Sequence, residues 1–170
     1  MKGDKIQLRA LEPEDLTFLY NIENDVKNWI VSETKIPFSK YLLKTYLDQA
    51  GLGIEKTGQF RFVIEETESM DSVGLIDVFD FDPINRRISL GVLVNEDYRN
   101  KGYAFEALSL IENYAAEQLN VHQIYCEVQA DNIKSIDLFS KNNYRISGTK
   151  KDWILKRDTF TDVLFFQKFL

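Results

Sequence analysis

Polar and apolar residues alternate in short runs along the first third of the chain, and the period changes where helices are expected. Residues 5–11, KIQLRAL, alternate with a period of two, which predicts a strand. Pro13 follows in the position of a first helical turn, with acidic residues placed for the positive end of the helix dipole. Ser39 is a suitable cap for a second helix, whereas the glycines in residues 50–58 predict a loop.

The rest of the chain continues with strands and helices in turn. Strands are predicted at 59–66, 73–81, 86–94, 123–129, 144–150 and 162–170. Helices are predicted at 103–119 and at 133–143, the second capped by Asp131 or Asn132. The last two strands are expected to form a hairpin. The resulting order, β-α-α-β-β-β-α-β-α-β-β, predicts an α/β fold of the α+β kind, with a mixed sheet and helices on both faces.

Composition supports one domain over residues 1–170. The chain is 44% hydrophobic and contains 12 Phe, 8 Tyr and 2 Trp, enough to build a sizeable core. The N-terminus has no apolar stretch of the signal-peptide type, and no apolar run approaches the roughly 18 residues of a membrane span. A cytoplasmic protein is therefore expected.

Cysteine, histidine and net charge argue against several classes of function. Cys126 is the single cysteine and His122 the single histidine, so neither a disulfide framework nor a metal site is expected. On a strand these residues would lie about 13 Å apart, too far for a nucleophile and its base. The net charge of −6 argues against general nucleic-acid binding, which favours basic surfaces.

Residues 95–108, NEDYRNKGYAFEAL, join an apolar strand to an amphipathic helix. The helix is expected to begin at Gly102 or Tyr103, where four backbone N–H groups lack partners and the helix dipole is positive. Gly102 leaves this end open, and Arg99 and Lys101 add positive charge. The residues alone allow two interpretations: a cradle for a phosphate or pyrophosphate, or a glycine-eased turn with two solvated basic side chains.

This junction also carries a family resemblance. Residues 99–104, RNKGYA, match the Arg/Gln-x-x-Gly-x-Gly/Ala pyrophosphate loop of the GCN5-related N-acetyltransferases, and residues 130–149, ADNIKSIDLFSKNNYRISGT, resemble that family's second coenzyme-contacting segment. The resemblance covers nearly the whole chain and implies acetyl-CoA as co-substrate, with its pantetheine paired to the strand before the loop. The coenzyme contacts that it implies are Leu93, Val94, Arg99, Asn100, Lys101, Gly102, Tyr103, Ala104, Asn132, Lys134, Ser135 and Phe139.

One position departs from the family pattern. Many relatives carry a tyrosine in the second coenzyme helix, proposed to protonate the leaving thiolate, and the aligned residue here is Phe139. Phenylalanine has no proton to give. Tyr144, Tyr103, Ser140 and water are the alternative donors, and Tyr144 is the catalytic candidate among them.

Carboxylates are the candidate groups for the acceptor. The chain resembles the branch with ribosomal-protein N-terminal and spermidine acetyltransferases, and the latter carry acidic residues matching Asp77 and Asp80. Asp77, Asp80 and Glu33 are candidate substrate ligands, and Asp77 is also a catalytic candidate; for each the alternative is a solvated surface charge. On an ideal strand Asp77 and Asp80 face opposite sides while Asp80 and Asp82 share one, an arrangement that a bulge would change.

The expected function is acetyl-CoA-dependent N-acetylation of a primary amine, with a polyamine such as spermidine as the expected acceptor. The alternatives are N-terminal acetylation of a protein such as a ribosomal protein, and a non-catalytic acyl-CoA-binding module. The expected partner is a small-molecule amine, with no nucleic acid, membrane or metal. A homodimer or higher homo-oligomer is compatible with the sequence.

Overall fold

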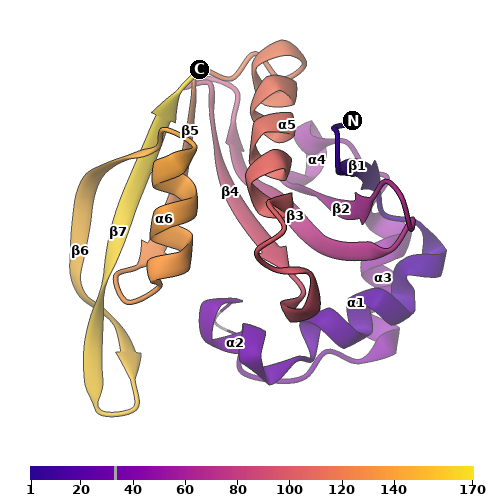
Figure 1. The fold of residues 1–170 in the computed structure, drawn as a ribbon, viewed down its shortest axis with the longest axis horizontal. Coiled ribbons are helices and arrows are strands. Elements are labelled where there is room, and N and C mark those ends of the chain that lie inside the picture. The colour runs from indigo at the N-terminus through magenta and orange to yellow at the C-terminus, as the bar shows by residue number, and fades with distance from the viewer. Residues whose placement is uncertain (33) are drawn as a thin grey trace.

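The computed structural model describes residues 1–32 and 34–170 and contains a seven-stranded mixed sheet (Figure 1). The strand order is β1-β2-β3-β4-β5-β7-β6, and all neighbours are antiparallel except the parallel pair β4 and β5. The strands are β1 (Ile6–Ala10), β2 (Phe60–Glu66), β3 (Ser72–Asp82), β4 (Arg87–Val94), β5 (Gln123–Gln129), β6 (Arg145–Lys156) and β7 (Thr159–Phe169). The predicted mixed α/β fold class is confirmed.

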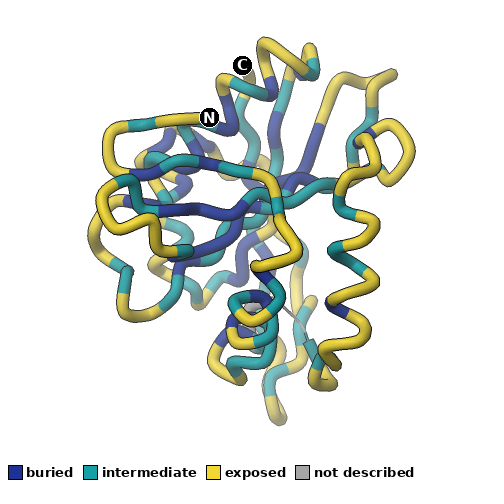
Figure 2. The backbone as a smooth tube through the Cα atoms, turned by 90° about the vertical axis from the view of Figure 1, so that its right-hand side faces the viewer, coloured by how far each residue is buried: buried dark blue, intermediate teal, exposed yellow. Residues whose placement is uncertain are grey.

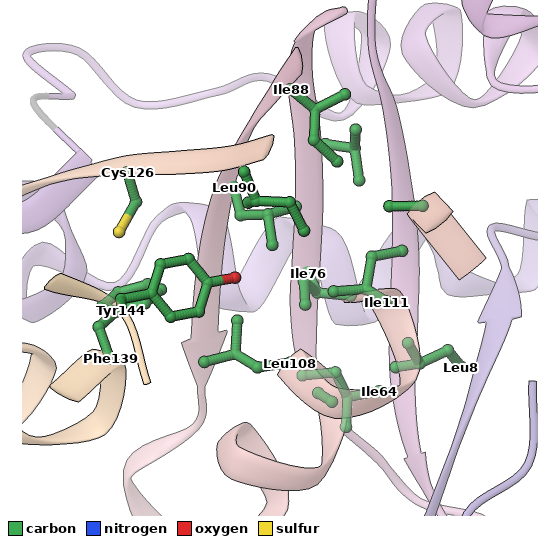
Figure 3. Packing of buried hydrophobic residues seen from close by; sticks show 14 of the residues in the cluster. Leu8, Ile64, Ile76, Ile88, Leu90, Leu108, Ile111, Cys126, Phe139 and Tyr144 are labelled. Atoms are coloured by element: carbon green, nitrogen blue, oxygen red, sulfur yellow. The ribbon is translucent and has the colours of Figure 1, made fainter. Parts of the chain in front are cut away.

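Helices cover both faces of the sheet because successive residues of a strand point to opposite sides. On β3, Leu75 packs with Leu19 of α1 (Leu16–Glu23) and Leu43 of α3 (Lys40–Gln49). The next residue, Ile76, belongs to the core under α5 (Tyr103–Glu117), which includes Leu108 and is seen in Figure 3. Phe139 of α6 (Ile133–Lys141) packs into that same core.

The buried residues lie mainly in the strands, between the helices on the two faces of the sheet. Figure 2 shows dark blue, buried segments running through the strands, with exposed yellow segments at the turns and along the outer sides of the helices. The hairpin of β6 and β7 projects past the end of α6 in Figure 1. Trp153 and Phe160, on these two strands, are more than half exposed. Among the residues that the structure describes, no helix is both long and apolar enough to cross a bilayer.

Two short helices were not expected from the sequence. α4 (Ile54–Thr57) lies inside the predicted loop 50–58, so that prediction was wrong for one helical turn, which ends where Gly58 adopts a φ of 69°. α2 (Val26–Ser32) is anchored to the end of α1, because the side chains of Asn28 and Trp29 donate to the carbonyl oxygens of Ile22 and Glu23. Neither helix has enough turns to show a clear apolar period.

Strands β4 and β5 diverge after a short parallel ladder. Their paired residues are Arg87 with Gln123, Ile88 with Ile124, and Ser89 with Tyr125. The remaining residues of β4, up to Val94, stay paired with β3 on their other side. Parallel pairing on one edge of β4 therefore stops in mid-strand, and the space that opens there positions the candidate site.

A bulge in β3 changes the direction of two aspartates. The register between β3 and β4 shifts between Phe79 and Asp82, and Asp80 has a φ of 53°. Asp77 and Asp80 both reach the cavity described below, whereas an ideal strand would have put them on opposite faces. The carboxylate of Asp82 instead accepts from the backbone and side-chain amides of Asn85 in the turn.

Candidate active site

A cavity of about 970 Å³ occupies the space where β4 and β5 separate. One side is formed by Leu90 to Leu93 of β4, and the other by Cys126 to Gln129 of β5 together with α6. Side chains of α1, α3, β2 and β3 close the remaining wall. The predicted residues that line the cavity are Leu93, Asn132, Ser135, Phe139, Asp77 and Asp80.

The loop between β4 and α5 has the backbone of an anion cradle. Asn100 and Gly102 have φ values of 65° and 89°, and Gly102 is the N-cap of α5 without a side-chain hydrogen bond to the first turn. Left-handed residues in such a turn direct neighbouring N–H groups to one side, which suits an anion at the positive end of a helix. A Cβ at Gly102 would meet the end of a flexible side chain, Lys5 Nζ, at 3.7 Å, so the approach to this end is open.

Basic side chains around this loop are held by the protein itself. Arg99 Nε donates to the Val94 carbonyl oxygen at 2.8 Å, so this guanidinium is tied to the end of β4. Lys101 Nζ lies 3.8 Å from Glu66 and over the ring of Tyr103. Lys5 Nζ donates to the Lys101 carbonyl oxygen at 3.2 Å. Lys5 was missed in the sequence, since nothing local to it indicates that it lies beside a loop 96 residues away.

The second segment predicted to contact the coenzyme reaches the cavity through one face of α6. Asn132 is the N-cap, and its side-chain oxygen accepts from Ser135 N at 3.2 Å. Of the two caps left open by the sequence, Asn132 rather than Asp131 therefore caps this helix. Phe139 lines the cavity and is 4% exposed, whereas Lys134 is exposed outside the lining.

The opposite end of the cavity contains an ion-paired cluster. Arg61 of β2 donates from Nε and Nη2 to the two carboxylate oxygens of Asp77, at 2.5 and 3.2 Å. Its Nη1 donates to Glu23 of α1 at 2.5 Å. The ring of Tyr46 from α3 lies 5.6 Å from the guanidinium carbon. Burial raises the pKa of Tyr46, and the positive charge of Arg61 partly opposes that shift.

Asp80 has a separate partner at the closed end of the splayed strands. The hydroxyl of Tyr125 donates to Asp80 Oδ2 at 3.0 Å, and the Tyr125 ring stacks on Phe165. Burial and this hydrogen bond raise the pKa of Tyr125 to about 12. Asp80 is itself exposed, so an incoming cation can approach it from solvent.

The predicted proton donor, Tyr144, is not brought to the cavity. Tyr144 is 3% exposed, packs edge-on against Phe139 and does not line the cavity; in Figure 3 its hydroxyl points away from Phe139. Burial, with the negative charge of Glu112 beneath it, raises its pKa far above the usual range. This position gives no support to Tyr144 as proton donor. Glu33 lies outside the described residues.

Cys126 and His122 have no shared site. Cys126 is buried and lines the cavity, where burial raises the pKa of its thiol. His122 is exposed, and its ring lies against Phe169. Over the described ranges 1–32 and 34–170, no group of three or more His, Cys, Asp or Glu residues is arranged to hold a metal ion.

Residues 5–145 match the family model of the acetyltransferase (GNAT) domain. The chain therefore belongs to the GCN5-related N-acetyltransferases, a family of acetyl-CoA-dependent acyltransferases. The left-handed turn at 99–104 and the separation of β4 from β5 are the features of this fold that a long, phosphate-bearing coenzyme would need.

Spermidine acetyltransferases of two bacteria are similar to this chain, one in sequence and the other in structure. The chain is 26% identical to spermidine N(1)-acetyltransferase of Escherichia coli (strain K12) over 148 residues, which covers 84% of this chain and 74% of that one. The crystal structure of spermidine N-acetyltransferase from Vibrio cholerae in complex with CoA and spermine superposes with a TM-score of 0.88. Identity in that pair is 22%, over 98% of this chain and 96% of the other. A dodecameric structure of the Vibrio cholerae enzyme gives a TM-score of 0.81 at 21% identity, over 98% and 95% of the two chains.

Proposed function

We propose that this chain transfers the acetyl group of acetyl-CoA to a primary amine of a polyamine, with spermidine as the first candidate. The observation that carries the proposal is the acidic end of the cavity, where Asp77 and Asp80 face the space between the splayed strands. The similarity to spermidine acetyltransferases supports the same acceptor. A polyamine is a flexible chain with several positive charges, and such a wall suits it electrostatically.

Acetyl-CoA supplies the acetyl group as a thioester, with a thiolate as the leaving group. The contribution of the protein is to bind acetyl-CoA and the amine and to orient them for reaction. Backbone N–H groups at 99–104 would hold the pyrophosphate, and the free edge of β4 near Leu93 and Val94 would pair with the pantetheine. Asn132 and Ser135 line the same cavity from α6. Holding both substrates in one cavity removes much of the entropic barrier to their reaction.

The acceptor amine must lose a proton before it can attack. An alkylamine has a pKa near 10.4 in water, so at neutral pH a group or water chain must accept that proton. We propose that Asp77 receives it or orders a water that does. Although Arg61 donates to both Asp77 oxygens, each carboxylate oxygen has a second lone pair with which it can accept from an amine.

The proposal is tested by CoA release over a panel of polyamines, peptides and aminoglycosides. We expect turnover of spermidine that falls as salt rises, since the Debye length shrinks from ~10 Å at 0.1 M to ~3 Å at 1 M. Asp77→Asn should raise the KM for spermidine more than that for acetyl-CoA. Asp82→Asn is the matched control, because Asp82 is on the same strand but outside the cavity. If spermidine is inert and a peptide amine reacts well, N-terminal acetylation replaces this proposal.

We also propose that copies of this chain associate. The support is the dodecameric structure of the Vibrio cholerae relative and the exposed apolar side chains on the β6–β7 hairpin, which include Trp153, Leu155 and Phe160. Light scattering on the purified protein should give a mass of at least two chains. A monomer at micromolar concentration would refute this part of the proposal.

A further inference from the structure

Arg61 lies between two carboxylates of the cavity wall and bonds to both. It extends from β2 between Asp77 on the paired strand β3 and Glu23 at the end of α1. All three of its nitrogens donate to carboxylate oxygens, at 2.5 to 3.2 Å. The carboxylates of Glu23 and Asp77 therefore share the single positive charge of Arg61 at the acidic end of the cavity.

The charge on Arg61 is permanent. Its side chain is 19% exposed, and burial by itself would lower the pKa of the guanidinium. Asp77 and Glu23 more than compensate, so the pKa is raised above its ordinary, already high value. A guanidinium in this position cannot give way to an incoming ammonium group by losing its proton.

This internal cation has a consequence for the acceptor. We propose that Arg61 is a specificity-determining residue: it occupies the place between Glu23 and Asp77 that an ammonium group of the acceptor would otherwise take. The inference rests on the proposed amine acetylation and makes its substrate class more specific. With Arg61 present, the Glu23–Asp77 pair offers one net negative charge, which matches one ammonium group beyond the reacting amine, and the exposed Asp80 can match a second.

The position of Arg61 in the cavity wall distinguishes a role in specificity from a purely structural role. Elsewhere in the sheet, Arg9 bonds Asp15 and Glu65, which are both buried and outside the cavity, so that cluster only ties elements together. Arg61, Glu23 and Asp77 instead line the cavity, where a ligand can reach them. Removing Arg61 should therefore change which ligands bind, whereas a purely structural arginine would change stability alone.

The test measures amine binding rather than turnover, by calorimetry on the CoA-bound protein at low salt. The ligands are butylamine, putrescine and spermidine, which carry one, two and three amino groups. In Arg61→Gln the affinity ratio of spermidine to putrescine should rise by about fivefold, the upper end of what an exposed ion pair contributes. Arg61→Lys retains the charge and should leave that ratio within about twofold of the wild type.

A second variant keeps the test decisive if Arg61→Gln does not fold. Glu23→Gln leaves Arg61 to neutralise Asp77, so the preference for putrescine over butylamine should fall, by up to about fivefold. An unchanged spermidine-to-putrescine ratio in folded Arg61→Gln, or an unchanged putrescine preference in Glu23→Gln, would overturn the proposal. So would the absence of measurable amine binding to the wild-type protein. If the ratios shift as expected while no amine in the panel releases CoA, amine acetylation fails and the role of Arg61 in selecting cations stands.

Discussion

A carboxylate at Gly102 should sharply weaken coenzyme binding. Gly102 caps α5 in the left-handed conformation, and a Cβ added there would meet Lys5 Nζ at 3.7 Å, an ordinary van der Waals distance. A longer side chain therefore fits sterically, and its effect comes from backbone strain and charge. A non-glycine residue in this conformation costs about 1–2 kcal/mol, and that cost is the same for glutamine and glutamate.

Electrostatic repulsion should make Gly102→Glu bind acetyl-CoA more weakly than Gly102→Gln does. A carboxylate about 6 Å from a phosphate charge is repelled by roughly 1.4 kcal/mol at an effective dielectric constant of ~40, and a pyrophosphate carries about two charges. The resulting ~3 kcal/mol corresponds to a loss of affinity on the order of 100-fold. The comparison of Gly102→Glu with Gly102→Gln isolates this term, because the two side chains have nearly the same shape.

Calorimetric titration with acetyl-CoA at low salt (about 0.05 M) and high salt (about 0.5 M) is the assay. We expect Gly102→Gln to bind within about 30-fold of the wild type, which is the strain cost of about 1–2 kcal/mol alone. Gly102→Glu should bind about 100-fold more weakly than Gly102→Gln at low salt, and the gap should narrow at high salt because the repulsion is screened. Equal affinities of the two variants at low salt would show that the pyrophosphate is not bound at this loop.

Three further predictions concern proton transfer and stability. Phe139→Tyr places a hydroxyl in the cavity and should raise kcat, since general-acid help is typically worth ~10²–10⁴-fold; an unchanged kcat with preserved coenzyme affinity would show that another donor already serves. Tyr144→Phe should leave kcat within about twofold, whereas a loss of ~10²-fold or more would restore Tyr144 as the acid. Asp15→Asn should cost roughly 1.5–3 kcal/mol in urea unfolding at pH 7, because Asp15 is buried and accepts from Arg9 at 2.7 and 2.8 Å. Burial opposes the charge on Asp15, but the bonds from Arg9 and from the Glu12 amide lower its pKa; that stability is therefore present above about pH 4 and is lost in acid, where the variant and wild type should converge. A difference that persisted at about pH 2 would contradict this reasoning.

Local spacing in the sequence was enough to predict the order of the strands and of the longer helices, and the position of the glycine-containing loop at 99–104. The repeat of apolar positions that marks a strand or a helix lies within a few neighbouring residues. The main strands and the long helix that begins at Tyr103 could therefore be predicted from the spacing of apolar residues alone. The loop at 99–104 was equally local: a glycine, two basic residues and a helix start follow one another along the chain. A cap at Asp131 or Asn132 was predicted for the same reason, since a cap and the amide that it accepts from are about three residues apart, and the structure shows that Asn132 is the cap.

Tertiary structure alone decided which charged groups meet in the cavity. The bulge that turns Asp80 toward the site depends on the register between β3 and β4, which no short segment specifies. Arg61 reaches Glu23 across 38 residues, and Lys5 reaches Lys101 in the loop at 99–104 across 96 residues. Such contacts are set by how strands pair and helices pack, because that packing buries the apolar core and thereby fixes where polar side chains at its edge must lie.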